Sequence, residues 1–376
     1  MSGFALRSWV EISRRQIAAN FRAIRDLVGP GVEVAAVVKA DAYHHGAVEV
    51  ARVLESEGAR WLAVASADEG AELRESGIAS RILVMSDTLA GNREMLAETR
   101  LTPVIHDLSA LRSWDEVARR FGAPLPYHIK VDSGFGRLGT LSSAREAAAA
   151  VHEARHARLE GVMTHFASAA DFDSRQTRNQ MEAFRIYLRE LREAGIEPRI
   201  VHMASSAPIA YARQDAWGNM VRPGLSLYGY IPAARGAAPP VVLDVKPALS
   251  WRAAVLVVKE VPAGVPIGYN ALFYAPRPMR IAVVAAGYAD GVPHTLSNKG
   301  AFIAAGRRAP IIGAVSMDVT TVDVSGCPGL APGDPVTIMG TEGEERQDAA
   351  GLAQDAGTIP YAILCGITSR VRRVYV

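Results

Sequence analysis

Cysteine is nearly absent from this chain of 376 residues, which contains only Cys327 and Cys365. Two cysteines exclude a disulfide framework and a multi-cysteine zinc site, and they favour a reducing compartment. An excess of charge of one sign is absent as well, because 41 basic side chains stand against 39 acidic ones. Nucleic acid is therefore not expected as a partner, since its recognition needs a strongly basic patch or stripe.

Long hydrophobic runs are also missing. The longest uncharged apolar stretch covers residues 281–289, far short of the roughly 18 residues that predict a membrane-spanning helix. The first twenty residues include Arg7, Glu11, Arg14 and Arg15, which leaves no apolar core for a signal peptide. We therefore expect a cytoplasmic protein with no membrane partner.

What the sequence does contain is apolar side chains, which make up 49% of the residues against 21% that are charged. This composition excludes a disordered or low-complexity chain and provides for a large buried core. At roughly 150 residues per domain, the length predicts two or three domains.

Between residues 34 and about 224, short β-branched runs alternate with amphipathic stretches of roughly 10–20 residues. Eight such runs begin near residues 33, 61, 81, 101, 126, 159, 199 and 219. Apolar runs that alternate with helices predict buried parallel strands, and eight of them close a (β/α)8 TIM-like barrel. A helix predicted over 13–28 precedes the first run, so we expect the N-terminal segment to pack outside the barrel or with a second domain.

The pattern changes after residue 236, where Pro239, Pro240 and Pro247 mark a connection and the long helical periods stop. Short strands with frequent glycine and proline follow, which predicts a mainly antiparallel β domain. One helix is expected within it, over 348–355, with Asp348 as its N-cap. The predicted domains are residues 1–238 and 239–376.

Polar side chains end several of the predicted barrel strands, namely Lys39, His165, His202 and Arg222. In such barrels the functional groups lie at this end of the strands. Lys39 is one of only five lysines, and its apolar neighbours would desolvate it and make a neutral amine available for a Schiff base. By position alone, the same lysine could equally extend its amine to solvent.

The sequence around Lys39 resembles a known attachment signature. Residues 36–43 read AVVKADAY and are followed by Gly46, a string similar to the pyridoxal-phosphate attachment site of alanine racemases. Further blocks that resemble this family follow in the family's order over essentially the whole chain: KVD at 130–132, GRLG at 136–139, THF at 164–166, VRPG at 221–224, GY at 268–269, GYADG at 287–291, MD at 317–318 and TIPY at 358–361.

The resemblance implies two residues that move protons. Lys39 would carry the cofactor, pyridoxal 5'-phosphate, through a Schiff base and would serve one face of the substrate Cα. Tyr269 of the partner subunit would serve the opposite face. Inversion without turning the substrate over requires one group that removes a proton and a second that returns one from the other side.

The resemblance also implies how the cofactor and the substrate are held. Arg222 would meet the pyridine nitrogen and, because an arginine keeps its proton, would leave the ring a weak electron sink. His165 would lie against the ring. The cofactor phosphate would be bound by Tyr43, Ser206, Gly224, Leu225 and Tyr361, and the substrate carboxylate by Arg137 and Met317, with Lys130, His202, Tyr288 and Asp318 in support.

The implied activity is racemisation of L- and D-alanine, supplying D-alanine for cell-wall peptidoglycan, by a homodimer with shared active sites. The alternatives are a broad-specificity amino-acid racemase and a barrel-type decarboxylase of amino acids. Lys130 matches a lysine that is often carbamylated in the family, and pairing with Asp132 is the other interpretation. No group of residues has the spacing of a metal site. Three departures from the family pattern, His44, Ser205 and His294, leave the substrate range open.

Overall fold

The computed structural model describes residues 6–87 and 89–376, and the chain divides into two compact units. Residues 17–42 and 47–246 form the first, which we call the barrel unit. The described residues up to 16, the short segment 43–46 and residues 247–376 form the second, which we call the β unit. The segment 43–46 therefore belongs to the β unit, although its neighbours in sequence belong to the barrel unit.

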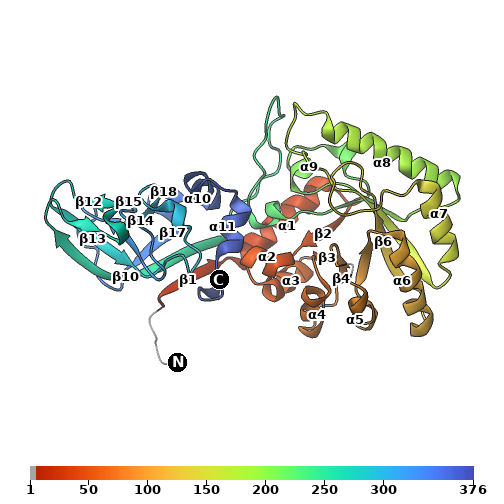
Figure 1. Cartoon of the computed structure of the whole chain (residues 1–376), viewed down its shortest axis with the longest axis horizontal. Helices are drawn as coiled ribbons and strands as arrows, with labels where there is room; N and C mark the ends of the chain where they lie inside the picture. Colours follow the sequence, from red (N-terminus) through yellow and green to blue (C-terminus); the bar gives the residue numbers. More distant parts are fainter. Residues whose placement is uncertain (1–5, 88) are drawn as a thin grey trace. The chain divides into compact units, whose positions relative to one another are not determined.

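Eight parallel strands, β2 to β9, close a barrel in chain order, and β9 pairs with β2 (Figure 1). The predicted (β/α)8 barrel is thereby confirmed. The strands are β2 (Glu33–Val37), β3 (Trp61–Val64), β4 (Arg81–Val84), β5 (Thr102–Ile105), β6 (Leu125–Lys130), β7 (Ala157–Met163), β8 (Ile200–His202) and β9 (Met220–Val221). The helices of this part of the chain are α1 (Arg14–Val28), α2 (Lys39–His44), α3 (Ala47–Ser56), α4 (Ala67–Glu75), α5 (Arg93–Glu98), α6 (Leu108–Phe121), α7 (Ala144–Glu153), α8 (Gln176–Glu193) and α9 (Ser206–Ala210).

The barrel elements follow from local sequence. All four residues of β3 and all four of β5 are buried, as expected for parallel strands covered on both faces. Helix α6 buries Leu111, Trp114 and Ala118 at helical spacing. The Asp107 side chain accepts a hydrogen bond from the Ser109 amide at its start, which satisfies one of the donors that a helix N-terminus leaves unpaired. The packed strands and helices of the barrel thus determine the positions of the strand ends, where functional side chains of such barrels lie.

The β unit is built on a nine-stranded, mainly antiparallel sheet, which confirms the predicted β domain. The N-terminal strand β1 pairs antiparallel with β10 and parallel with β19, and is thus part of this sheet. The strands of the unit are β1 (Ser8–Ile12), β10 (Leu249–Val261), β11 (Pro266–Ile267), β12 (Phe273–Tyr274), β13 (Met279–Val284), β14 (Ala301–Ala304), β15 (Arg307–Pro310), β16 (Thr320–Asp323), β17 (Pro335–Glu342), β18 (Glu345–Gln347) and β19 (Arg372–Tyr375).

Two helices lie within the β unit. Helix α10 (Ala349–Ala356) begins after Asp348, whose side chain accepts hydrogen bonds from the Ala350 and Gly351 amides, so the expected helix and its cap are present. Helix α11 (Pro360–Gly366) was not predicted, although proline at a first helical position is typical of a helix start.

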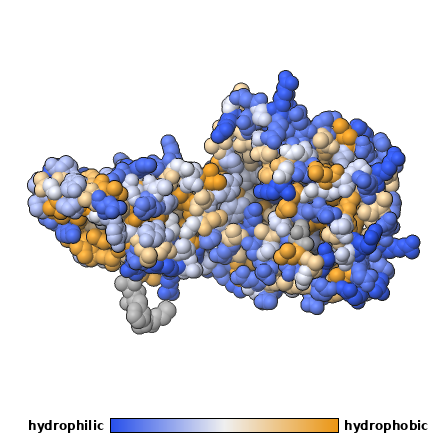
Figure 2. Space-filling view, viewed as in Figure 1, coloured by the Kyte–Doolittle hydropathy of each residue, from blue (hydrophilic) through white to orange (hydrophobic). Residues whose placement is uncertain are grey.

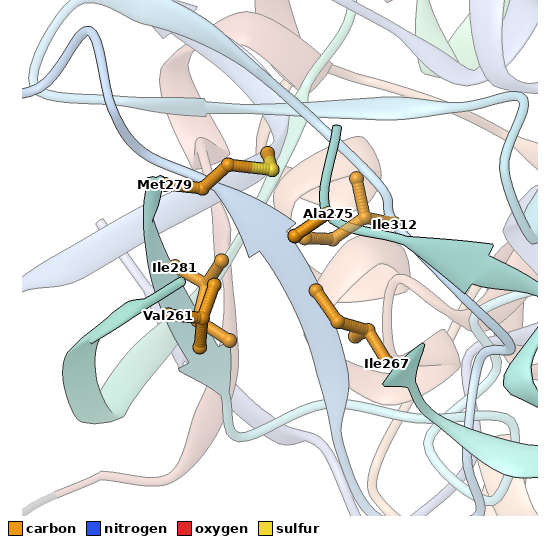
Figure 3. Close-up of a cluster of buried hydrophobic side chains, with 6 residues drawn as sticks. All are labelled: Val261, Ile267, Ala275, Met279, Ile281 and Ile312. Atoms are coloured by element: carbon orange, nitrogen blue, oxygen red, sulfur yellow. The ribbon is translucent and has the colours of Figure 1, made fainter. Parts of the chain in front are cut away.

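A cluster of buried apolar side chains joins β10 and β13 to the β11–β12 hairpin. It consists of Val261, Ile267, Ala275, Met279, Ile281 and Ile312, with Val265 and Phe273 packed against it. Figure 3 shows the labelled side chains gathered between these strands. Since the hairpin loop carries Tyr269, this cluster anchors the base from which that tyrosine projects.

The surface of the β unit carries several large exposed apolar side chains. Figure 2 shows apolar residues gathered at the end of this unit where Figure 1 labels β10, β12 and β13. The exposed residues of the unit include Leu256, Val257, Tyr269, Leu272, Tyr274, Tyr288 and Met317. Along the described ranges, none of the helices has the length and apolar character needed to cross a membrane.

Candidate active site

Basic and imidazole side chains meet at the C-terminal ends of the barrel strands. Lys39 follows β2, Lys130 ends β6 and His202 ends β8. His165 follows β7 and Arg222 follows β9. The grouping shows in the electrostatics, because burial and then Arg222, Lys130, Arg137 and Lys39 lower the pKa of His165 well below its ordinary value. His165 is therefore a neutral ring among cations.

Arg222 is buried, and its hydrogen-bond acceptors among the described residues are neutral. Its Nη1 lies 2.9 Å from His202 Nδ1, and its Nη2 lies 3.3 Å from His165 Nδ1. Nη2 also donates to the carbonyl oxygens of Thr164, at 2.9 Å, and Met203, at 3.0 Å. Burial lowers the pKa of Arg222 to about 9, which still leaves it charged at neutral pH. A buried arginine fixed in this way is suited to face a polar group of a bound molecule.

The chain after Lys39 forms a left-handed helical turn. Residues 40–44 all have positive φ, with angles of 51°, 51°, 54°, 54° and 62°. Residues other than glycine rarely adopt this backbone conformation, because Cβ crowds the following carbonyl oxygen. Glu69 fixes its beginning, accepting from the Ala40 and Ala65 amides at 2.7 Å, and Asp41 accepts from the Ala47 amide at 2.7 Å. Backbone strain of this kind is often located at functional sites.

In the β unit, the segment 43–46 lies beside the C-terminal residues. Tyr43 is buried, its ring centroid is 6.0 Å from that of Tyr361, and burial raises the pKa of its phenol. His44 Nδ1 lies 2.5 Å from the carbonyl oxygen of Ile367 and 3.4 Å from Arg373 Nη2. The side chain of His44, one of the departures from the family pattern, is thus engaged with the segment 367–373.

A buried cluster of hydroxyl and amide groups surrounds Ser206, the first residue of α9. Its Oγ accepts hydrogen bonds from the Gly224 and Ser226 amides, each at 3.1 Å. Ser206 and Leu225 are almost fully buried. Ser205 precedes the helix without a side-chain capping bond. A buried set of amides and hydroxyls is suited to an oxyanion such as a phosphate.

Lys130 lies in a positively charged environment. Burial, Arg137 and Arg222 lower its pKa to about 8, against the opposing effect of Asp132. The Asp132 carboxylate accepts hydrogen bonds from four backbone amides of residues 134–137, which hold its pKa low although partial burial would raise it. Arg137 is exposed and lies over the Phe135 ring at 4.3 Å. Asp132 thus organises the loop that carries Arg137.

In the β unit, Tyr269 begins the loop between β11 and β12, and its side chain is 70% exposed. Tyr288 and Met317 are also exposed, at 44% and 52%. Their two loops are tied together by the Tyr288 amide, which donates to the Ser316 carbonyl oxygen at 3.0 Å. A Cβ at Gly287 would come within 2.2 Å of that same oxygen, so only glycine permits this approach.

Asp318, a predicted supporting residue, and His294, a departure from the family pattern, lie next to these loops. Asp318 accepts from Arg370 Nη2 at 2.6 Å, and Arg370 also lies 3.4 Å from Asp290. His294 begins a short 3-10 turn, with its ring centroid 6.3 Å from that of Tyr288. The structure therefore brings Tyr288, Met317 and Asp318 together in one unit, and Lys39, Lys130, His165, His202 and Arg222 together in the other.

Sequence reasoning missed a set of buried polar residues in the barrel. His128 on β6 and Glu160 on β7 are almost fully buried. His128 lies 2.8 Å from His202 through one ring nitrogen and 3.7 Å from Glu160 through the other. Their signal in the sequence is a histidine and a glutamate inside apolar strand runs, which is unusual because buried charges need partners. In the described ranges, no group of three or more His, Cys, Asp or Glu side chains could hold a metal ion.

The closed barrel, the sheet unit and the basic cluster at the strand ends define this chain as a two-domain, barrel-type enzyme. The model of the alanine racemase N-terminal domain matches residues 12–232, and that of the C-terminal domain matches residues 248–375. The chain belongs to the alanine racemase family, which depends on pyridoxal phosphate.

Individual relatives match this chain over nearly their full length. The alanine racemase of Halothermothrix orenii is 38% identical over 98% of this chain and 96% of its own, and that of Carboxydothermus hydrogenoformans is 39% identical over 98% and 99%. The alanine racemase structure from Streptomyces lavendulae superposes with a TM-score of 0.93, at 33% identity, over 100% and 98% of the chains. The Bartonella henselae enzyme, solved with covalently bound pyridoxal phosphate, gives a TM-score of 0.87 at 29% identity over 98% and 99%.

Proposed function

We propose that this chain interconverts L- and D-alanine as a pyridoxal phosphate-dependent racemase. The observation that carries the proposal is Arg222, which is buried at the strand ends and bonded to two neutral imidazoles and two carbonyl oxygens. Facing the pyridine nitrogen of the cofactor, Arg222 would donate a hydrogen bond without giving up its proton, so the ring would remain a weak electron sink and side reactions would be suppressed. A decarboxylase of this barrel type would be expected to have a carboxylate there.

The residues present fit the cofactor. Lys39, at the end of β2, would hold it covalently through Nζ. The phosphate would be bound by the amide and hydroxyl groups of Ser206, Gly224 and Leu225, with Tyr43 and Tyr361 completing the site. Once bound, the cofactor withdraws electrons from the substrate Cα and so weakens its C–H bond. The neutral ring of His165, 3.3 Å from Arg222, would lie beside the cofactor ring.

Two groups would move the proton at Cα. Lys39 Nζ would take or return it on one face, and Tyr269 Oη of the partner subunit on the other. Each group accepts a proton in one direction of the reaction and donates it in the reverse direction. The substrate carboxylate would be oriented by Arg137 and the Met317 amide, since a guanidinium binds carboxylates with fixed geometry.

Lys130 would be carbamylated. Its lowered pKa of about 8 makes the neutral amine accessible, and the Asp132 carboxylate is already occupied by the amides of its own loop. The amine nitrogen would bond to the carbon of carbon dioxide and lose one proton, and the resulting anion would attract the Arg137 guanidinium. Three residues would support the site. His202 would do so through its contact with Arg222, Tyr288 through the loop that carries Met317, and Asp318 through Arg370.

The assembly would be a homodimer with shared active sites. The support is the exposure of Tyr269, Tyr288 and Met317 on the β unit, since polar and aromatic side chains of this kind would be completed by a second subunit. Mixing Lys39→Ala subunits with Tyr269→Phe subunits should restore activity, because one site of each hybrid dimer would be intact. Absence of recovery after verified subunit exchange would contradict the shared site. We also propose a cytoplasmic location, in keeping with a chain that contains only two cysteines.

The test of the activity is hydrogen exchange of L- and D-amino acids in deuterated water by the cofactor-loaded protein. Deuterium at Cα together with both enantiomers of alanine is the expected result, and a panel of larger amino acids measures substrate breadth. Tyr269→Phe should keep exchange with only one enantiomer, whose hydrogen faces Lys39. Release of carbon dioxide without inversion would refute the proposal in favour of a decarboxylase.

A further inference from the structure

A line of buried polar side chains runs through the barrel interior from Arg222 to Glu160. Arg222 Nη1 lies 2.9 Å from His202 Nδ1, and His202 Nε2 lies 2.8 Å from His128 Nδ1. His128 Nε2 lies 3.7 Å from Glu160 Oε2. His128 and His202 have no exposed surface, and Glu160 has 2%. The four residues come from β6, β7, β8 and the end of β9, so the line crosses adjacent strands.

The proton positions along this line are determined by its two ends. Arg222 can only donate, so His202 Nδ1 must accept and its proton must lie on Nε2. That proton points to His128 Nδ1, which must accept in turn, and His128 then carries its proton on Nε2. The ionised Glu160 carboxylate can only accept, and it faces that nitrogen at 3.7 Å, close enough for electrostatic attraction but longer than a hydrogen bond. Burial lowers the pKa of both rings, and Arg222 lowers that of His202 further, so both are neutral and each carries a single proton.

The local backbone of β7 is shaped for this contact. In the pairing of β6 with β7, Tyr127 faces Leu159 and His128 faces Gly161, so Glu160 is an extra residue without a partner. Such a bulge redirects a side chain, and bulges are rare between parallel strands. A Cβ at Gly161 would lie 2.6 Å from His128 Nδ1. The bulge and the glycine together make room for the buried pair.

Glu160 is held in its charged form. Arg81 binds both carboxylate oxygens, with Nη1 2.8 Å from Oε1 and Nη2 on Oε2. Arg199 Nη2 adds a third bond, 2.6 Å from Oε1. Burial alone would raise the pKa of Glu160, but His128 and the two arginines keep it well below its usual range. Arg81 is in turn stacked over the Trp61 ring at 3.9 Å.

We propose that Glu160 is a positioning residue, which acts through His128 and His202 to hold Arg222 in one orientation toward the cofactor ring. Its charge fixes the protons of both rings on Nε2, so that His202 presents a lone pair to Arg222. The link to the cofactor ring rests on the proposed function, whereas the proton positions do not. The competing view is that Glu160 only stabilises the barrel through its arginines.

The variant Glu160→Gln separates the two views. Two arginine donors reach Oε1 and one, Arg81 Nη2, reaches Oε2, so the glutamine oxygen would occupy the Oε1 place. Its NH2 group would then face His128, and the bond from Arg81 Nη2 would be lost. A donor at that point would move both ring protons. His128 would carry its proton on Nδ1, and His202 would do the same, so that an N–H group of His202 would face the N–H donor of Arg222. Arg199→Gln is the matched control, because it removes one ion pair from Glu160 but leaves the carboxylate, Arg81 and the acceptor for His128.

The first measurement is the side-chain nitrogen NMR spectrum of the cofactor-free protein labelled with ¹⁵N-histidine. In the wild type and in Arg199→Gln, Nδ1 of His128 and His202 should show the shift of an unprotonated nitrogen, and in Glu160→Gln both should move to the protonated range. Protonated Nδ1 atoms in the wild type, native proton positions in Glu160→Gln, or reversal in both variants would each overturn the proposal. This readout does not depend on the racemase activity, so a failure of the proposed function can be distinguished from a failure of the proposed role of Glu160.

The second measurement uses the cofactor-loaded protein. Misorientation of Arg222 should shift the visible absorption band in Glu160→Gln and lower kcat by about 10-fold with KM nearly unchanged, the size of loss that outer partners of a site commonly show. Arg199→Gln should retain the wild-type band. Equal spectra and rates for the two variants would mean that Glu160 has only a structural role.

Discussion

The left-handed turn after Lys39 predicts an unusual response to glycine. Ala40 has φ of 51° and an exposed side chain, so Ala40→Gly removes backbone strain without removing a buried methyl group. The left-handed conformation costs an alanine about 1–2 kcal/mol, and the greater freedom of glycine in the unfolded chain offsets about 0.4–1 kcal/mol of that gain. We therefore expect a net increase of roughly 0.5–1 kcal/mol in the free energy of unfolding.

The matched control is Ala149→Gly in α7, another exposed alanine of the barrel unit. In a right-handed helix this change should lower the free energy of unfolding by about 1 kcal/mol. The assay is urea unfolding of the cofactor-free variants, which avoids stabilisation by the ligand. The two variants should shift the midpoint in opposite directions. If Ala40→Gly lost stability as Ala149→Gly does, the strain assigned to this turn would be refuted.

Three further predictions concern buried groups of the barrel. Gly161→Ala should lower the free energy of unfolding by about 1–3 kcal/mol, because its Cβ would lie 2.6 Å from His128, and an unchanged urea midpoint would contradict this. His106 has its pKa lowered to about 4 by burial and by Lys130, so the unfolded state takes up its proton first as the pH falls. The free energy of unfolding should thus be unaffected above about pH 6.5 and decline by up to about 3 kcal/mol toward pH 4. In His106→Gln this decline with pH should be less steep. Equal pH dependence of the two proteins, measured by urea unfolding, would count against the prediction. Lys130 should give a carbamate ¹³C resonance with labelled bicarbonate above pH 8, where its amine is largely neutral, and Lys130→Arg should give none; a resonance that survives the substitution belongs to another amine.

The barrel could be predicted from the sequence because each strand and helix is specified by neighbours along the chain. Runs such as 61–64 are apolar throughout, and α6 repeats its apolar residues at helical spacing. The position of Lys39 follows as well, since it directly succeeds a buried strand. Local pattern and the order of elements were sufficient to place these features.

Features that depend on distant partners could not be predicted in this way. Residues 40–44 contain ordinary helix-forming side chains, and their left-handed conformation depends on contacts such as that of Ala40 with Glu69. Residues 157–163 read as one regular strand, but the bulge at Glu160 requires Arg81 and Arg199 from other parts of the chain. The single-residue signal was a lone acidic side chain in an apolar run, which does not reveal its partners.

The pairing of β1 has a consequence for synthesis on the ribosome. Trp9 pairs with Arg252 and Val10 with Arg373, so β1 gains its second neighbour only after β19 has been synthesised and has none before β10. Until then its backbone donors and acceptors have no strand beside them, and exposed edges of this kind promote aggregation. A chain that stops between β10 and β19 would release β1 with one permanent open edge, so we expect termination there to yield insoluble product.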